Sequence, residues 1–197
     1  MKLSLPDVTL VMYESKDPER GLKVFSHVAN LIEFGNHLFV TNRKDGLAGS
    51  ARFVVCDLSW HLQTSHCLII HIDGFPIHPE NWRPEFLHYD YIGALWPDGP
   101  RRMGNGVGIR SKKLCDQLAC FEFNPTRDPE DVFICIQKRD ELEQMGFQFA
   151  PDELAAQFSL EQEIPGVTKS YDDVFMFHGS PNKGGYPTQR FIEEALK

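Results

Sequence analysis

The chain has 197 residues, of which 42% are hydrophobic and 24% are charged, a composition typical of a soluble globular protein with one domain over residues 1–197. Its formal net charge of −8 argues against a protein that coats nucleic acid nonspecifically, because phosphate binding normally needs a basic face. No apolar run is long enough for a signal peptide or a membrane span, so we expect a cytoplasmic protein.

Strand and helix signals alternate through the first half of the chain. Pro18 stands where a helix is expected to begin, and apolar residues then recur at helical spacing up to Gly35, which suits the position just past a helix end. This alternation predicts an α/β fold whose central sheet is mostly parallel and flanked by helices. The predicted strands of this half are 6–13, 37–41, 52–56 and a buried strand around 68–70.

A glycine-rich loop and several helices make up the predicted second half. Residues 97–108 contain four glycines and two prolines, a composition that lets a backbone approach a ligand closely. Ser111 is a suitable N-cap for a helix over 112–119, and the acidic residues after Pro129 suit the first turn of another helix. The remaining predicted elements are a strand over 89–94, a helix over 153–158, a strand over 174–178 and a C-terminal helix from Thr188.

The buried central strand runs into the sequence His71-Ile72-Asp73-Gly74. Because side chains alternate along a strand, His71 and Asp73 are expected to leave the sheet on the same side. The open end of such a strand is where α/β enzymes place metals and phosphates, and imidazole and carboxylate groups are both metal ligands. The alternative is structural: Asp73 opens an Asp-Gly turn and His71 is a hydrogen-bonded histidine at the rim of the sheet.

Three further features follow in order along the chain. The turn 104–108 leads to Arg110, a Glu-Asp pair stands at 130–131, and His178 begins a short segment that reaches Lys183. Each feature has a common structural explanation, as a glycine turn, as acidic residues that complement a helix dipole, or as a loop. Their order is more specific than any one of them.

This order resembles the GT-A class of nucleotide-sugar glycosyltransferases and is similar to that of β-1,3-galactosyltransferase-type enzymes. The segments 67–75, 82–94, 104–111 and 129–132 look like a family of GT-A-like domains of unknown function, so the likeness covers most of the chain. The resemblance implies a single GT-A-like, Rossmann-related domain. This chain departs from the pattern at His71, which stands where the first D-x-D carboxylate would be, and at 107–109 in the middle of the glycine turn.

The resemblance also implies a reaction. A sugar would move from a nucleotide-diphosphate sugar, such as a UDP-sugar, to an acceptor hydroxyl, with Mn²⁺ or Mg²⁺ neutralising the departing diphosphate. The expected metal ligands are Asp73 and His178, which favours manganese, together with His71. Asp131 is the expected general base and Glu130 the second candidate, and a base on that face of the sugar predicts inversion at the anomeric carbon.

The candidate donor-binding residues come from several parts of the chain. The glycine turn offers backbone amides to phosphates, and Arg110 and Lys183 offer positive charge, although Arg110 is equally well explained as a surface residue. Trp96 is a candidate for stacking on a sugar or a base, although most aromatic clusters belong to a core. The full set is Tyr13, Asn42, Lys44, His71, Trp96, Asn105, Gly106, Arg110 and Lys183.

Two classes of acceptor fit the sequence. One is a glycan or lipopolysaccharide precursor, and the other is a hydroxymethylated pyrimidine in DNA, the base that some small phage sugar transferases modify. The basic residues between 101 and 113 favour contact with a phosphate backbone, whereas the net charge of −8 counts against DNA. Two other functions stay open: a catalytically inactive GT-A-like module that binds a nucleotide or sugar, and a metal-dependent phosphoesterase that uses His71, Asp73 and His178. The sequence does not indicate an oligomeric state.

Overall fold

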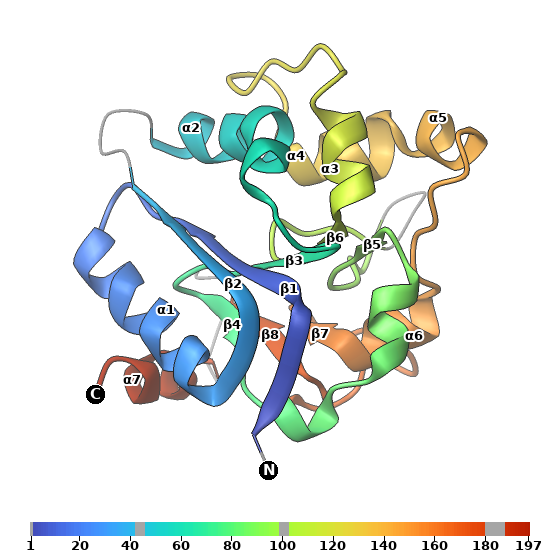
Figure 1. Cartoon of the computed structure of the whole chain (residues 1–197). Coiled ribbons are helices and arrows are strands. Elements are labelled where there is room, and N and C mark those ends of the chain that lie inside the picture. The colour runs from blue at the N-terminus through green and yellow to red at the C-terminus, as the bar shows by residue number, and fades with distance from the viewer. Residues whose placement is uncertain (1, 42–45, 99–102, 180–187) are drawn as a thin grey trace.

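Two β-sheets lie between helices in the computed structural model, which describes residues 2–41, 46–98, 103–179 and 188–197 (Figure 1). The larger sheet has the strand order β2-β1-β3-β6-β5, and the smaller has the order β4-β8-β7. The strands of the larger sheet are β1 (Leu3–Tyr13), β2 (Ile32–Val40), β3 (His66–Ile69), β5 (Tyr91–Ile92) and β6 (Gly108–Ser111). Those of the smaller sheet are β4 (Gly74–Pro76), β7 (Ser159–Leu160) and β8 (Met176–His178).

The larger sheet is mixed, so the predicted mostly parallel sheet is wrong. β1 pairs in parallel with both β2 and β3, whereas β6 runs antiparallel to both β3 and β5. Parallel neighbours need a crossover, and helical segments provide one between β1 and β2 and another between β2 and β3. The described residues between β5 and β6, 93–98 and 103–107, contain no helix. Strand β6 pairs with β5 in the opposite direction, as adjacent antiparallel strands can without a crossover helix.

Helix α1 (Pro18–Leu31) covers one face of the sheet and begins as predicted. The Asp17 side chain accepts a hydrogen bond of 3.1 Å from the backbone N–H of Arg20, and Pro18 occupies the first turn. Val24, Phe25 and Val28 are buried against apolar side chains of β1, and each such burial contributes about 1.5–3 kcal/mol. The helix ends earlier than predicted because Ile32 is already extended and starts β2.

Gly35 therefore lies inside β2 and is not a helix cap. A Cβ atom at this position would lie 1.8 Å from the carbonyl oxygen of Pro6 on the neighbouring strand. The register of β1 and β2 shifts between Leu5 and Thr9, which is where the two backbones approach this closely. Glycine is required here for the close approach of β1 to β2.

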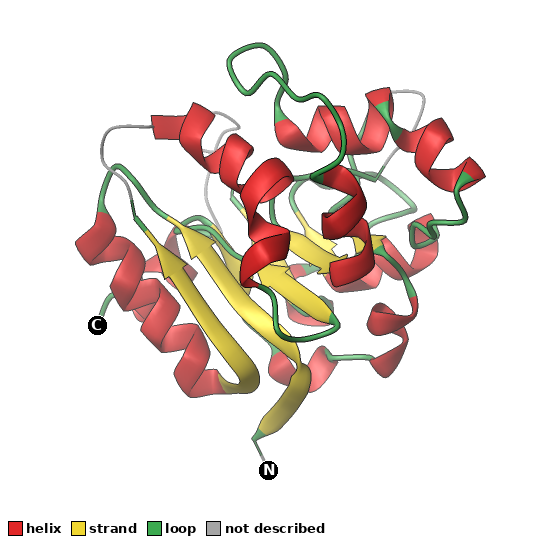
Figure 2. Ribbon diagram, turned by 45° about the horizontal axis from the view of Figure 1, so that its top comes forward, coloured by secondary structure: helices red, strands yellow, loops and turns green. Residues whose placement is uncertain are grey.

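Helices also cover the opposite face of the sheet, as Figure 2 shows. Helix α2 (Gly46–Arg52) continues as a π-helical turn over Phe53–Asp57 and a 3₁₀ turn over Leu58–His61, and these two turns pack beside α3 (Lys112–Leu118). The predicted strand 52–56 is thus wrong. A short apolar run fits a buried strand and a buried helix turn equally well, and here Phe53, Val54 and Leu58 pack against β1 and β3.

The remaining helices surround the smaller sheet and the far edge of the larger one (Figure 1). Helices α6 and α7 lie at the positions predicted from sequence, and α7 lies beside α1. Among the helices described, none combines the length and the apolar character needed to cross a bilayer. The helical segments are α4 (Glu130–Val132), a π-helical turn (Phe133–Gln137), α5 (Arg139–Gln144), α6 (Asp152–Phe158), α7 (Gln189–Ala195) and 3₁₀ turns at Pro79–Asn81, Pro84–His88 and Tyr171–Asp173.

Asp90 joins β6, α3 and the segment before α6. Its buried carboxylate accepts hydrogen bonds from the Ser111 hydroxyl at 2.6 Å and from the Gln148 backbone N–H at 2.8 Å. Ser111 in turn caps α3 by accepting a hydrogen bond of 3.0 Å from the Leu114 backbone N–H. The strand that carries Arg110 is therefore held in place by a buried carboxylate.

We predict that Asp90→Asn lowers the free energy of unfolding by about 1–3 kcal/mol. The carboxylate accepts two hydrogen bonds, one at each oxygen, whereas an amide has a single accepting oxygen and its NH₂ group would face the other donor. Asp116→Asn is the matched control, since Asp116 is half-exposed and pairs with Lys112 one helical turn away. Its expected effect is below about 0.5 kcal/mol. Urea denaturation measures both, and equal losses would contradict the role of Asp90.

Candidate functional site

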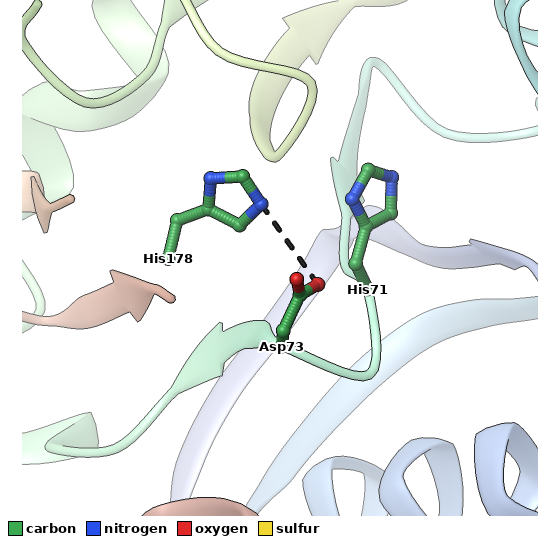
Figure 3. A group of neighbouring side chains, drawn as sticks. All are labelled: His71, Asp73 and His178. Atoms are coloured by element: carbon green, nitrogen blue, oxygen red, sulfur yellow. Dashed lines mark ion pairs between the residues drawn. The ribbon is translucent and has the colours of Figure 1, made fainter. Parts of the chain in front are cut away.

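The turn that follows β3 places His71 and Asp73 beside His178 at the end of β8 (Figure 3). The turn is closed by two backbone hydrogen bonds between His71 and Gly74, at 2.8 Å and 3.2 Å. Gly74 pairs with His178 across the β4–β8 ladder, and the Gly179 N–H donates to the Asp73 carbonyl at 2.5 Å. The structure thus brings together three side chains that the sequence predicts as metal ligands.

These three side chains converge on one point. Their ligand atoms all lie within 4.8 Å of one another, and Asp73 Oδ1 is 3.9 Å from His178 Nε2. A first-row divalent cation binds nitrogen and oxygen at about 2.0–2.2 Å, so small side-chain rotations would bring the three atoms to one ion. Two imidazoles and one carboxylate suit Mn²⁺ better than Mg²⁺, which prefers oxygen ligands alone. The residues therefore fit a cation.

The protonation of the two histidines differs. Burial, followed by the nearby His178, lowers the pKa of His71, so this imidazole stays neutral near pH 7, as a metal ligand must be. Burial also opposes the charged form of His178, but the carboxylates of Glu161 and Asp73 outweigh it and raise the pKa of His178. His178 thus holds its proton more strongly than a free imidazole does.

The glycine turn lies directly beside this cluster. A Cβ atom on Gly106 would lie 2.7 Å from Glu130 Oε1 and 3.1 Å from the His71 ring, so the turn passes close beside these two side chains. Asn105 reaches the opposite side of the cluster, where its side-chain amide donates to His178 Nδ1 at 2.9 Å and to Glu161 Oε2 at 3.0 Å. The turn therefore contacts both the histidines and the carboxylates.

Glu161 is a site residue that the sequence prediction missed. It follows the two-residue strand β7, and its carboxylate oxygen Oε1 lies 3.6 Å from His178 Nδ1. The region around it has little hydrophobic periodicity and no recognised motif. No local sequence signal indicates that this glutamate faces the end of β8.

Arg110 is buried, so its interpretation as a surface residue is wrong. Only 1% of the residue is exposed, its Nη2 atom lies 4.0 Å from Glu130 Oε1, and its guanidinium group lies over the Tyr91 ring, 5.4 Å from the centroid. Within the described part of the chain, its Nη1 atom has no hydrogen-bond partner. Arg110 therefore pairs with a candidate base.

Asp131 and Glu130 begin helix α4 close to the same cluster. Burial, followed by the adjacent Glu130, raises the pKa of Asp131, and the Asp131 carboxylate is near enough to raise the pKa of His178 in turn. A carboxylate with a raised pKa is a stronger base than an ordinary one. Both residues of the predicted pair thus lie near the predicted metal ligands.

A cavity of about 470 Å³ connects the cluster with the end of β1 and the start of α1. His71, Asp73 and His178 line one part of it, and Tyr13 lines another, as the sequence predicts for a donor contact. Its basic side chains, Lys16 and Arg20, were not predicted, although a strand followed by a capped helix start is a recognisable phosphate-binding pattern. The other lining residues are Glu14, Ser15, Asp17, Ser50, Ile72, Gly179, Thr188, Gln189 and Ile192.

One family of known sequences matches the part of the chain that carries most of these residues. A family model described as a protein of unknown function (DUF5672) matches residues 52–176, which is more than half of the chain. The chain belongs to the DUF5672 family. The matched range includes His71, Asp73, the glycine turn, Glu130 and Glu161, and it ends two residues before His178. No curated protein matches the chain significantly.

The other predicted donor contacts have different positions or lie outside the described residues. Trp96 is partly buried and covers Gly104, where a Cβ atom would lie 2.0 Å from the indole ring. It therefore packs on the glycine turn of this DUF5672 member and not in the wall of the cavity. Asn42, Lys44 and Lys183 lie outside the described residues.

We predict that Glu161→Gln lowers the pKa of His178 in the metal-free protein, because it removes the carboxylate 3.6 Å from Nδ1. Since this pKa is raised from 6.5 in the wild type, the linked stability is fully present below about pH 6.5 and is lost as the pH rises through the folded-state value. The variant should therefore be less stable than wild type mainly at acidic pH.

An NMR titration of the imidazole protons measures the pKa of His178 directly. Glu163→Gln is the matched control, since Glu163 is exposed and only two residues away. A His178 pKa that is the same in wild type and Glu161→Gln would contradict the assignment of Glu161 as its main partner.

Proposed function

We propose that the protein is a metal-dependent, inverting glycosyltransferase that moves a sugar from a nucleotide-diphosphate sugar to an acceptor hydroxyl. One observation carries the proposal. The same cavity contains the His71, Asp73 and His178 cluster in one part and the basic side chains Lys16 and Arg20, beside the start of α1, in another. A nucleotide diphosphate needs both features, because its charge is shared between a cation and cationic side chains. The resemblance to the GT-A class supports the same function.

The cation is assigned to His71, Asp73 and His178. When bound, it would neutralise the charge that develops on the departing diphosphate. Among the described residues, carboxylates outnumber cationic groups around this cluster, and such a surplus of negative charge favours cation binding. The four carboxylates that face the cluster or its histidines are Asp73, Glu130, Asp131 and Glu161.

The donor is assigned to the cavity beside α1. Lys16 and Arg20 line it near the first turn of a helix that is 14 residues long, and the Arg20 Nε atom has no hydrogen-bond partner in the described part of the chain. Such a position suits a phosphate group. Tyr13 lines the same cavity and is assigned to the nucleoside, with UDP as the first donor to test.

Asp131 is assigned as the general base that takes the proton of the acceptor hydroxyl. Its raised pKa makes its carboxylate more basic, whereas the neighbouring Glu130 lies 4.0 Å from the buried guanidinium of Arg110. The ion pair holds the Glu130 carboxylate toward Arg110, so Glu130 remains the second candidate. Arg110 is accordingly reassigned from the donor phosphate to Glu130.

A glycan or lipopolysaccharide precursor is the acceptor that the structure favours over DNA. The basic residues between 101 and 113 do not form a free cationic face among the described residues. Arg110 is buried, Lys112 pairs with Asp116 at 2.7 Å, and Lys113 lies 4.6 Å from the Phe147 ring centroid. Arg101 and Arg102 lie outside the described residues. A backbone of phosphates would find few available partners here.

We predict that Mn²⁺ together with UDP, GDP, CDP or one of their sugars raises the melting temperature of the wild-type protein. Ligand at 100 times its dissociation constant adds about 2.7 kcal/mol to stability. Asp73→Ala should lose the manganese-dependent part of the shift, whereas Asp172→Ala, which removes an exposed carboxylate, should keep it. The absence of any shift with all three nucleotides and their sugars would contradict the proposed donor class.

We predict that Asp131→Asn lowers kcat about 10²- to 10⁴-fold, because it removes the base without removing a donor contact. The thermal shift with donor and Mn²⁺ should be unchanged in this variant. Glu130→Gln is the matched comparison and should retain more activity. Wild-type activity in Asp131→Asn would contradict the assignment of Asp131 as the base. A wild-type protein that binds the donor without transferring the sugar would favour the inactive module, and release of phosphate from simple esters would favour the phosphoesterase.

A further inference from the structure

His178 has two different polar neighbours at the ring nitrogen that faces away from Asp73. The Asn105 side-chain nitrogen lies 2.9 Å from Nδ1, and Glu161 Oε1 lies 3.6 Å from the same atom. On the other side of the ring, Nε2 faces Asp73 at 3.9 Å (Figure 3). Nε2 is therefore the nitrogen available to a cation, and Nδ1 is the nitrogen that the protein holds.

The orientation of the Asn105 amide is determined by its contacts. The Val107 backbone N–H donates to Asn105 Oδ1 at 3.0 Å, so the amide nitrogen must be the atom that faces Glu161 and His178. An amide nitrogen only donates. In this arrangement His178 Nδ1 accepts a hydrogen bond, and the proton of the neutral ring lies on Nε2.

A cation at Nε2 requires the other tautomer. The proton on Nε2 leaves to water and Nδ1 takes one from water, so the net charge of the ring does not change. Nδ1 then becomes a donor, and it needs an acceptor within the protein because His178 is largely buried. Glu161 Oε1, at 3.6 Å, is the acceptor beside it. A small rotation of the ring brings Nδ1 into hydrogen-bond distance of Oε1 and away from the Asn105 amide nitrogen, which keeps its hydrogen bond to Glu161 Oε2.

The backbone at Asn105 is strained in a way that serves this contact. Its φ angle is +97°, and it is the only non-glycine residue with a positive φ in the described part of the chain. The Tyr91 hydroxyl donates to the Asn105 carbonyl at 2.5 Å and holds the peptide in place. Strain of this kind persists where the surroundings impose it, commonly at functional sites.

We propose that Glu161 is a positioning residue that selects the cation-binding tautomer of His178, and that Asn105 holds the Glu161 carboxylate in place for this role. The proposal rests on the proposed function only in that a cation binds at His71, Asp73 and His178. A hydrogen-bonded carboxylate behind a ligating histidine fixes its orientation and increases its basicity. The donor sugar and the acceptor do not enter this inference.

The test is the affinity of the metal-free protein for Mn²⁺ alone, measured by isothermal titration calorimetry. Glu161→Gln should weaken binding about 10- to 100-fold, because the amide offers a donor where Nδ1 needs an acceptor. Glu161→Asp keeps the carboxylate and should recover part of the affinity. Glu163→Gln, the exposed neighbour, should bind as wild type does.

The melting temperatures of the metal-free variants separate this role from a purely structural one. If Glu161→Gln is less stable, the comparison of Glu161→Asp with Glu163→Gln still tests the proposal in folded proteins. Wild-type affinity in Glu161→Gln would overturn the role of Glu161 and leave the cation site standing. A wild-type protein that binds no Mn²⁺ would remove the cation site and this role with it.

Discussion

The antiparallel pairing of β4 with β8 is the contact on which the candidate site depends. It places Gly74 opposite His178, and the hydrogen bond from Gly179 to the Asp73 carbonyl extends the same ladder beyond the strands. These are main-chain contacts, and a shift of one residue along β8 would turn the His178 imidazole to the opposite face of the sheet. Two segments about 100 residues apart in the chain thus share one site because their backbones pair, and not because their side chains attract each other.

The glycine turn adds the second constraint, which is close approach. A Cβ atom on Gly106 would crowd both Glu130 and His71, and the adjacent Asn105 reaches His178 and Glu161 from a left-handed backbone conformation. One short segment therefore lies beside two of the candidate metal ligands and beside Glu130.

Charge in the site is arranged in two layers. The inner layer consists of the His71 and His178 imidazoles and the Asp73 carboxylate, which line the cavity. The outer layer includes the Glu161 carboxylate, 3.6 Å from His178 Nδ1, and the Glu130 carboxylate beside Arg110. The buried arginine pairs with Glu130 at 4.0 Å. Such an arrangement favours a cation in the inner layer and leaves a partly buried carboxylate, Asp131, with a raised pKa beside it. The proposed chemistry uses both consequences.

The sequence alone determined the features that depend on local pattern. Short-range hydrogen bonds and side-chain periodicity specify these local features. They are helix α1 with Asp17 and Pro18 at its start, the capped start of α3, the strand-end turn at His71 and Asp73, and the glycine turn. Only the tertiary structure decided which way β6 runs, that residues 52–56 are helical, that Arg110 is buried against Glu130, and that Glu161 faces His178. These features depend on contacts between segments that are distant in sequence. The physical reason is that packing of the whole chain sets strand direction and burial, and a short stretch of sequence does not specify that packing.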